Sequence, residues 1–170
     1  KAGSNINLGC RNRRRHSPYP VKASKMNGVI SLSEQQFKII QAAAEAAYPA
    51  ECCGLLAGNI HAENHIVKRV VPSPNIVADQ AKDRFEIDPQ IHINLERELR
   101  GSLDQIIGHY HSHPDHPPVP SETDLKMAYG PILIWLIAAV DKGKFVDLKA
   151  HQINETKQHF EEIALRITPA

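Results

Sequence analysis

Two histidines and one aspartate are the residues of this sequence best suited to chemistry. His111 and His113 are two residues apart, so on an extended strand both imidazoles point to the same side. Asp124 follows after a proline-rich turn and can approach them from another segment. Two neutral imidazoles and one carboxylate suit Zn²⁺, and three protein ligands leave the fourth tetrahedral position open for water. The sequence therefore predicts a catalytic zinc site.

The segment 121–124 also has a simpler interpretation. Ser121 followed three residues later by an acidic residue is typical of a helix N-terminus that the serine caps. A single histidine, likewise, is usually an ordinary packed or surface residue. The combination of His-x-His-Pro, a gap of six residues and Ser-x-x-Asp favours the metal site. Both interpretations hold if a short helix that begins at Ser121 directs Asp124 back toward the end of the strand.

These residues carry a family resemblance. The pattern HSHP at residues 111–114, six residues, then Ser121-x-x-Asp124 resembles the complete signature of the JAMM (MPN-plus) zinc metallopeptidases. The segment 49–58, PAECCGLLAG, resembles the upstream block of that family, and of its small stand-alone prokaryotic members in particular. The similarity runs from about residue 31 to about residue 140. It implies that the histidines and the aspartate bind Zn²⁺.

The resemblance also implies catalytic roles for Glu51 and Ser121. Glu51 matches the upstream glutamate of the family and would move a proton from water to the leaving amine, a contribution worth roughly 10² to 10⁴ in rate. Ser121 would donate a hydrogen bond to the oxyanion, which is worth roughly 3 kcal/mol. Without the resemblance, Glu51 would be a solvated acid near the start of a strand.

The substrate expected from the resemblance is the flexible C-terminal tail of a ubiquitin-like or sulfur-carrier protein, cut at a peptide or isopeptide bond. We expect an open groove in which the tail adds to a sheet edge, with the loop 72–83 as a clamp. The alternative is a non-catalytic scaffold or interaction domain of the same fold. Scaffold relatives lose metal ligands, whereas this chain keeps all of them.

Composition excludes several other classes of protein. With 170 residues and 42% hydrophobic content, the chain can form one domain with a sizeable core, and no apolar run approaches the ~18 residues of a membrane span. Residues 1–30 contain seven Lys or Arg and no acid, which leaves 13 basic and 19 acidic residues in the remainder. The acidic remainder argues against nucleic acid as a partner and disfavours a nuclease-associated function.

The three cysteines, Cys10, Cys52 and Cys53, do not form a disulfide framework, because adjacent cysteines pair only with strain and no CxxC is present. This favours a reducing, cytoplasmic environment. Cys52 or Cys53 could supply the nucleophile of a cysteine protease, but nothing around them indicates a lowered pKa. The His-x-Glu at residues 61–63 lacks the downstream Pro-Cys-x-x-Cys of zinc deaminases and is coincidental.

Residues 1–25 differ from the rest of the chain. They are rich in Arg, Asn, Ser and Pro, without apolar periodicity and without the apolar segment of a secretory signal. We interpret them as a disordered or vector-derived basic leader, which is favoured over a basic arm for nucleic acid. Met26 is a candidate natural start, and the predicted metallopeptidase domain spans residues 26–170.

The first half of the domain is expected to begin with a helix at residues 33–47, because Ser33 and Gln36 form a capping-box pattern and Tyr48-Pro49 ends the helical spacing. The elements expected next, in chain order, are a buried strand at 52–57, a turn at Gly58-Asn59, a strand at 65–71, a loop at 72–83, a short strand at 84–87, and a helix between an Asp88 N-cap and Gly101.

In the second half, the strand 105–111 delivers the metal ligands, and His109 shares their side, where it packs or supports them. Residues 131–140 are too continuously apolar for a surface strand and indicate a central one. Further strands are expected at 144–151 and 162–167. The sequence thus predicts an α/β fold with a mixed central β-sheet sandwiched by helices, the α/β/α, cytidine-deaminase-like arrangement of the resembled family.

Overall fold

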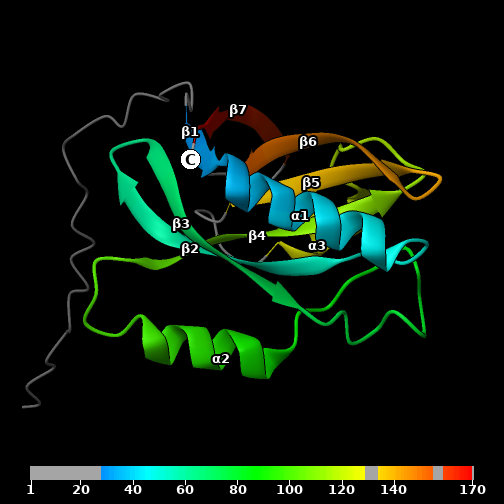
Figure 1. Ribbon diagram of the computed structural model, residues 1–170, viewed down its shortest axis with the longest axis horizontal. Coiled ribbons are helices and arrows are strands. Elements are labelled where there is room, and N and C mark those ends of the chain that lie inside the picture. The colour runs from blue at the N-terminus through cyan, green and yellow to red at the C-terminus, as the bar shows by residue number, and fades with distance from the viewer. Residues whose placement is uncertain (1–27, 129–133, 155–158, 170) are drawn as a thin grey trace, which may run out of the picture.

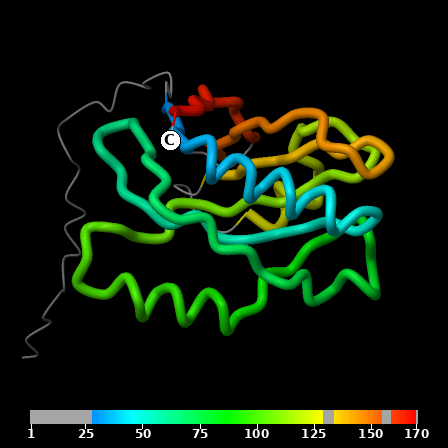
Figure 2. Tube along the Cα trace, in the orientation of Figure 1, coloured from blue at the N-terminus to red at the C-terminus, as the bar shows by residue number. Residues whose placement is uncertain are grey.

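The computed structural model describes residues 28–128, 134–154 and 159–169 (Figures 1 and 2). The elements in these ranges are β1 Val29–Ser33, α1 Glu34–Ala47, β2 Cys53–His61, β3 Asn64–Ser73, α2 Pro89–Glu98, β4 Gln105–Pro114, α3 Glu122–Met127, β5 Ile134–Asp141, β6 Lys144–Ile153 and β7 Phe160–Thr168. The leader expected at residues 1–25 lies outside the described residues.

The strands form one mixed sheet that closes on itself in the order β1-β3-β2-β4-β5-β6-β7. β4 is parallel to β5, and β1 is parallel to both β3 and β7, whereas the other neighbouring strands are antiparallel. The predicted mixed sheet is confirmed. The prediction that helices sandwich this sheet is right only in part, because the sheet is closed. The unpredicted strand β1 joins its two edges, since Val29 is paired with both Asn64 and Ala164.

The helix α1 begins and ends as predicted. Ser33 caps it, with its hydroxyl accepting from the Gln36 backbone and the Gln36 side chain accepting from the Ser33 backbone, at 3.2 and 2.8 Å. The helix ends where Tyr48 leaves helical geometry before Pro49. Because the cap fixes where the helix starts, Ile40 and Ala44 face the sheet and are buried.

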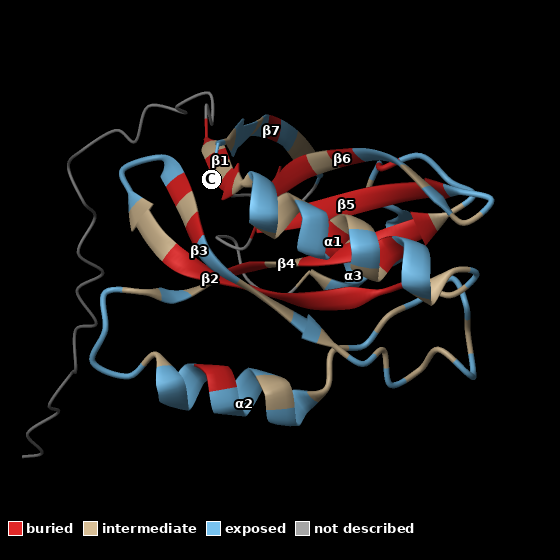
Figure 3. Ribbon diagram, in the orientation of Figure 1, coloured by how far each residue is buried: buried red, intermediate tan, exposed pale blue. Residues whose placement is uncertain are grey.

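The sheet has two differently covered sides, which the alternation of side chains along β2 shows. Leu56 belongs to the large core cluster that contains Ile40 of α1. Its neighbours Leu55 and Ala57 point the other way and pack with Leu95 of α2. The two longer helices therefore lie on opposite sides of the sheet, and the strands between them are the most buried part of the molecule (Figures 1 and 3).

The strand β2 is longer than predicted. The expected turn at Gly58-Asn59 is wrong, because β2 continues to His61 and turns into β3 at Ala62, which has a φ of 54°. Gly58 lies at an irregularity of the β2–β3 pairing, where a Cβ atom would collide with the Ile66 carbonyl group. The glycine thus permits a close approach of two backbones and does not form a turn.

The connection between β3 and α2 is a loop with little regular structure. The predicted strand at 84–87 is wrong: Ile87 forms only an isolated bridge with Asn75. α2 then begins as predicted, with Asp88 as its N-cap and Pro89 in the first turn. The later strands agree with the prediction, and the described part of the 131–140 run, β5, lies between β4 and β6.

None of the helices in the described residues is long and apolar enough to span a membrane.

Candidate functional site

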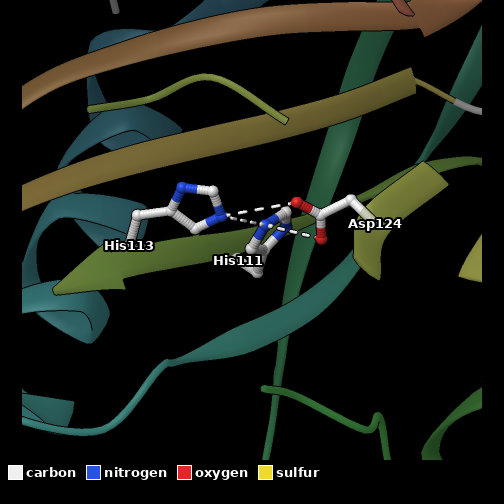
Figure 4. Close-up of side chains that lie close together, drawn as sticks. All are labelled: His111, His113 and Asp124. Carbon is white, nitrogen blue, oxygen red and sulfur yellow. Dashed lines mark hydrogen bonds and ion pairs between the residues drawn. The ribbon is translucent and has the colours of Figure 1, made fainter. Parts of the chain in front are cut away.

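The centre of the candidate site is the group His111, His113 and Asp124 (Figure 4). Both histidines come from the end of β4 and point to the same side, and α3 brings Asp124 opposite them. The Nε2 atoms of His111 and His113 lie 3.4 and 3.5 Å from the two carboxylate oxygens of Asp124. The candidate ligand atoms all lie within 4.8 Å of one another, and all three residues are buried. This group could hold a metal ion.

The hydrogen bonds of the histidines fit such an ion. His113 Nδ1 lies 3.1 Å from the Pro117 carbonyl oxygen, so this nitrogen carries the hydrogen and Nε2 is left with its lone pair. His113 Nε2 lies only 3.0 Å from His111 Nε2. Two ring nitrogens that face each other beside a carboxylate need either a shared proton or a shared cation. A backbone carbonyl that fixes the ring tautomer is also the usual support of a metal-binding histidine.

The charges in the group are set by burial and by mutual contact. Burial lowers the pKa of His111 well below its ordinary value, so this ring is neutral at pH 7. Burial alone would raise the pKa of Asp124, but contact with His113, the His111 ring and hydrogen bonds from Ser121 hold it well below its ordinary value. A neutral imidazole and an ionised carboxylate are the protonation states that metal binding requires.

His113 differs from His111 in this respect. Burial opposes a charge on its ring, but contact with Asp124, the bond to Pro117 and the charge of Glu51 together raise its pKa. The two carboxylates thus favour a positive charge at this point of the site, which either a proton or a metal cation can supply.

Ser121 both caps α3 and holds Asp124. Its hydroxyl accepts from the Asp124 backbone N–H at 3.1 Å and donates to Asp124 Oδ2 at 2.7 Å. The Ser121 backbone N–H donates to the same oxygen at 2.6 Å. The N-cap of α3 therefore also orients the candidate ligand Asp124. The two interpretations of residues 121–124 are compatible. For an oxyanion role, the hydroxyl has to rotate its hydrogen away from Asp124.

Glu51 lies just before β2 and is 6% exposed. Burial raises the pKa of its carboxyl to about 8, with a charge on His113 acting in the opposite direction. Glu51, Ser121 and Asp124 all line one pocket with a volume of about 690 Å³. The structure therefore brings together the five residues singled out from the sequence, although Glu51 precedes the others by 60 to 73 positions.

The loop 72–83, which we expect as a clamp beside the metal, does line this pocket, whereas sequence reasoning missed its other walls. The loop before α2 lines it through residues 77–87, and Met127 and Trp135 line it from α3 and β5. Phe85 stacks on His111, with ring centroids 4.4 Å apart and an angle of 18° between the rings. The only signal for Phe85 was an isolated aromatic among charged residues, which we placed in a strand.

Two other expectations concern residues near the group. His109 packs, with its ring 4.0 Å from that of Trp135, and burial lowers its pKa to about 4. Cys52 and Cys53 are buried free thiols, as expected for Cys53. Burial raises their pKa values to about 11 and about 12, so neither is an activated nucleophile. Cys10 lies outside the described residues.

The chain is similar to known proteins over most of its length. The family described as prokaryotic homologs of the JAB domain (Prok-JAB) matches residues 33–153. A desampylase of Haloferax volcanii is 34% identical over 119 residues, which cover 70% of this chain and 79% of that protein. Tail tip assembly protein K of Escherichia phage N15 is 29% identical over 112 residues, which cover 66% of this chain but only 42% of the phage protein.

Solved structures show the same fold. The solution structure of a Desulfitobacterium hafniense protein, DSY2949, is similar with a TM-score of 0.71 and 30% identity, covering 83% of this chain and 94% of that one. A JAB1/MPN domain protein from Archaeoglobus fulgidus, AF2198, is similar with a TM-score of 0.50 and 21% identity, covering 82% and 97%.

Proposed function

The chain belongs to the prokaryotic JAB-domain family, and from this premise we propose that it is a zinc-dependent peptidase or isopeptidase. Its substrate in this proposal is the C-terminal tail of a ubiquitin-like or sulfur-carrier protein, and its place of action is the cytoplasm. The name of the Haloferax relative, desampylase, describes an enzyme that reverses a conjugation. That relative matches this chain over most of the length of both proteins, which supports the same class of reaction here.

One observation carries the proposal. Asp124 of the buried group His111, His113 and Asp124 lines one pocket together with Glu51 and Ser121, so a candidate metal site, a carboxyl with a raised pKa and a hydroxyl meet at one place. Perturbed titratable groups in a pocket favour a catalytic site. A non-catalytic scaffold, the alternative, needs none of these groups and would not need to bury them.

The chemistry is amide hydrolysis. When bound, Zn²⁺ supplies Lewis-acid polarisation of the scissile carbonyl and makes water nucleophilic at neutral pH. Glu51 takes a proton from the attacking water at its carboxylate and gives it to the nitrogen of the leaving amine. Its raised pKa suits this exchange, because a carboxyl with a pKa near the working pH both accepts and returns a proton.

Ser121 supports the transition state in this proposal. Its hydroxyl lines the pocket beside Asp124 and can turn toward the oxygen of the scissile carbonyl as negative charge develops there. Asp124 Oδ2 then keeps its hydrogen bond from the Ser121 backbone, so the carboxylate stays oriented.

The substrate has to reach the site as a flexible segment. The expected addition of the tail to a sheet edge finds no edge strand in the described part of the sheet, because β1 closes it. The tail therefore lies in the pocket between the loop before α2 and α3. Glycine at the cleavage site lets the backbone approach the buried ligands, since it has no side chain to collide with the walls.

The test presents two substrates to the zinc-loaded protein: a sulfur carrier with a short C-terminal extension after its Gly-Gly, and the same carrier linked to a lysine side chain. Mass spectrometry should show trimming back to the diglycine in at least one. Glu51→Gln should keep its zinc and lose at least ~10²-fold in rate, because the amide cannot move the proton. Glu122→Gln is the matched control, since the Glu122 side chain is 94% exposed on α3.

The outcomes separate the parts of the proposal. Intact carriers in both forms, with turnover of other peptides, would contradict the substrate class but not the hydrolase. Normal turnover in Glu51→Gln would remove Glu51 from the mechanism and leave the segment 49–58 as a packing motif.

A further inference from the structure

The loop before α2 forms a wall of the pocket without belonging to a helix or strand. We call residues 74–88 the pocket loop. Its most connected side chain is that of Asn75, which is partly buried. The Asn75 amide donates from Nδ2 to the carbonyl oxygens of Glu51 and Arg84, at 3.0 and 2.9 Å. Its Oδ1 accepts from the backbone N–H groups of Val77 and Glu86, at 3.2 and 3.1 Å. An amide has two donor hydrogens and two acceptor lone pairs, so every position is used.

These bonds join the two ends of the pocket loop to each other and to Glu51, which lies 24 positions before Asn75. One bond from Asn75 reaches the Glu51 carbonyl before β2. A second reaches Val77 near the start of the pocket loop, and two more reach Arg84 and Glu86 near its end. No helix or strand contains Glu51. Its backbone is instead held by the loop on both sides, since its N–H donates to the Lys82 carbonyl at 3.2 Å and its carbonyl accepts from Asn75. Asn75 thus helps to fix the position of the Glu51 backbone, from which the carboxyl side chain extends.

The same amide fixes a second part of the site. Arg84 and Glu86, which Asn75 holds, flank Phe85 in the sequence. The Phe85 ring stacks on His111 and lies edge-on to Trp135, with centroids 6.4 Å apart. A shift of this backbone therefore uncovers the buried histidine and the tryptophan beside it.

The pocket loop has other anchors, so that loss of Asn75 need not unfold the protein. The Cys53 sulfur lies 3.7 to 3.9 Å from the carbonyl oxygens of Ser73, Pro74 and Glu86. The Asp88 backbone N–H donates to the Ser73 hydroxyl at 3.0 Å. These contacts hold the ends of the loop, whereas Asn75 alone reaches from the loop to the Glu51 carbonyl among the hydrogen bonds of the described residues.

We propose that Asn75 is a positioning residue, which sets Glu51 and Phe85 relative to the His111, His113 and Asp124 group. Its effect on turnover rests on the proposed function, whereas its effect on the pocket wall does not. Misplacement of a catalytic group by about 1 Å can cost ~10²-fold in rate, so the amide can matter for catalysis without touching substrate.

The test compares Asn75→Asp and Asn75→Ala with Asn59→Ala. Asn75→Asp keeps the size and one acceptor but places an oxygen where the two donated bonds were. Asn59 is the matched control, because its amide also donates to a residue distant along the chain, Asp104, at 3.2 Å, and neither residue lines the pocket. Both Asn75 variants should keep one zinc and lose at least ~10-fold in kcat. Placed on top of Glu51→Gln, the same substitutions should cost less than they do in the wild type, since the part of the effect that acts through Glu51 is already lost.

A second readout does not need activity. Trp135 is the only tryptophan in the sequence and is 3% exposed behind Phe85. Acrylamide should quench its fluorescence more strongly in both Asn75 variants than in wild type and Asn59→Ala. If the wild type hydrolyses neither the carriers nor other peptides, the proposed function fails and quenching alone decides the role of Asn75.

Three results would overturn the proposal. The first is turnover and quenching in the Asn75 variants equal to those of Asn59→Ala. The second is a full additional loss of rate on the Glu51→Gln background. The third is loss of the fold in Asn75→Asp as well as in Asn75→Ala, which would make the residue a structural one.

Discussion

The two sides of β4 are made of different chemistry, although the residues alternate along one strand. His109, His111 and His113 point to the side with the pocket. Tyr110, between them, points to the other side and belongs to the core cluster under α1. Ser112 bonds to the backbone just before β2, since its hydroxyl accepts from the Cys52 N–H at 2.9 Å. One strand thus serves both functions of the fold, with stability on the α1 side and chemistry on the pocket side.

The two sides of β4 also differ in how their buried polar atoms are arranged. On the pocket side, ring nitrogens and carboxylate oxygens converge within 4.8 Å, an arrangement that a cation would stabilise. Buried atoms without a hydrogen-bond partner among the described residues occur on both sides: His109 Nε2 and His111 Nδ1 beside that group, and the Tyr110 hydroxyl by itself on the α1 side. Polar groups that converge indicate a ligand, whereas a single buried hydroxyl indicates only the filling of space. Substitutions on the pocket side should therefore affect zinc binding and turnover, whereas substitutions on the α1 side should affect the free energy of unfolding.

The largest effect is expected on the pocket side, from His113→Ala. Two remaining ligands should bind Zn²⁺ at least ~100-fold more weakly, because even supporting residues around a metal cost up to that much when lost. Turnover should disappear with the metal, while far-UV circular dichroism stays close to wild type. Zinc competition with a chelator measures the affinity.

His92→Ala is the control for this change, since His92 lies on α2 with an exposed side chain near Glu96. Equal zinc binding by His113→Ala and His92→Ala would contradict the metal site, and with it the division of β4 into two sides.

The next largest effect is expected on the α1 side, from Leu136→Ala. Leu136 is paired with Tyr110 in the neighbouring strand and is fully buried in the core cluster. The cavity should lower the free energy of unfolding by ~2 to 5 kcal/mol, whereas the folded fraction still binds one zinc. Urea unfolding measures the first quantity and metal analysis the second. Leu103→Ala, at a residue that is 93% exposed, should change neither. Loss of zinc from folded Leu136→Ala would mean that the two sides are coupled.

Local sequence patterns predicted much of this arrangement. A capping box needs only residues three apart, so the starts of α1 and α3 at Ser33 and Ser121 could be found. The alternation of a strand needs only neighbours, so His111 and His113 could be placed on one side. Asp124 could be added because its helix start lies close in the chain to the end of β4.

The rest depends on contacts between distant residues. β1 is five residues long and is paired with β3 and β7; the Thr168 hydroxyl donates to the Leu32 carbonyl across 136 positions. No local sequence pattern predicts such a pairing. Gly58 was mistaken for a turn because close approach to a neighbouring backbone and a tight turn both require glycine. The hydrogen bonds of Asn75 reach back to Glu51 and forward to Glu86, so its role is visible only once the loop is folded.

The smallest effect is expected from Tyr110→Phe, on the α1 side of β4. Burial raises the pKa of the Tyr110 hydroxyl, with the Cys52 and Cys53 thiols adding to the effect. Removing a buried hydroxyl that has no partner should leave stability unchanged or raise it by up to ~1 kcal/mol. Because the folded pKa lies above the unfolded value of 10, the unfolded state loses this proton first as the pH rises past 10, and the native state loses stability relative to it. Phenylalanine should therefore lessen the alkaline loss.

Urea unfolding of wild type and Tyr110→Phe at about pH 7 and about pH 11 measures both effects, since the buried thiols contribute equally to the two proteins and cancel. Tyr48→Phe is the control, because the Tyr48 hydroxyl is satisfied by Asp115 Oδ2 at 3.0 Å and its loss should bring no gain. A clear loss of stability in Tyr110→Phe would show that the hydroxyl has a partner in solution. The α1 side of β4 would then contain a polar site of its own, and the contrast with the histidine side would be one of degree.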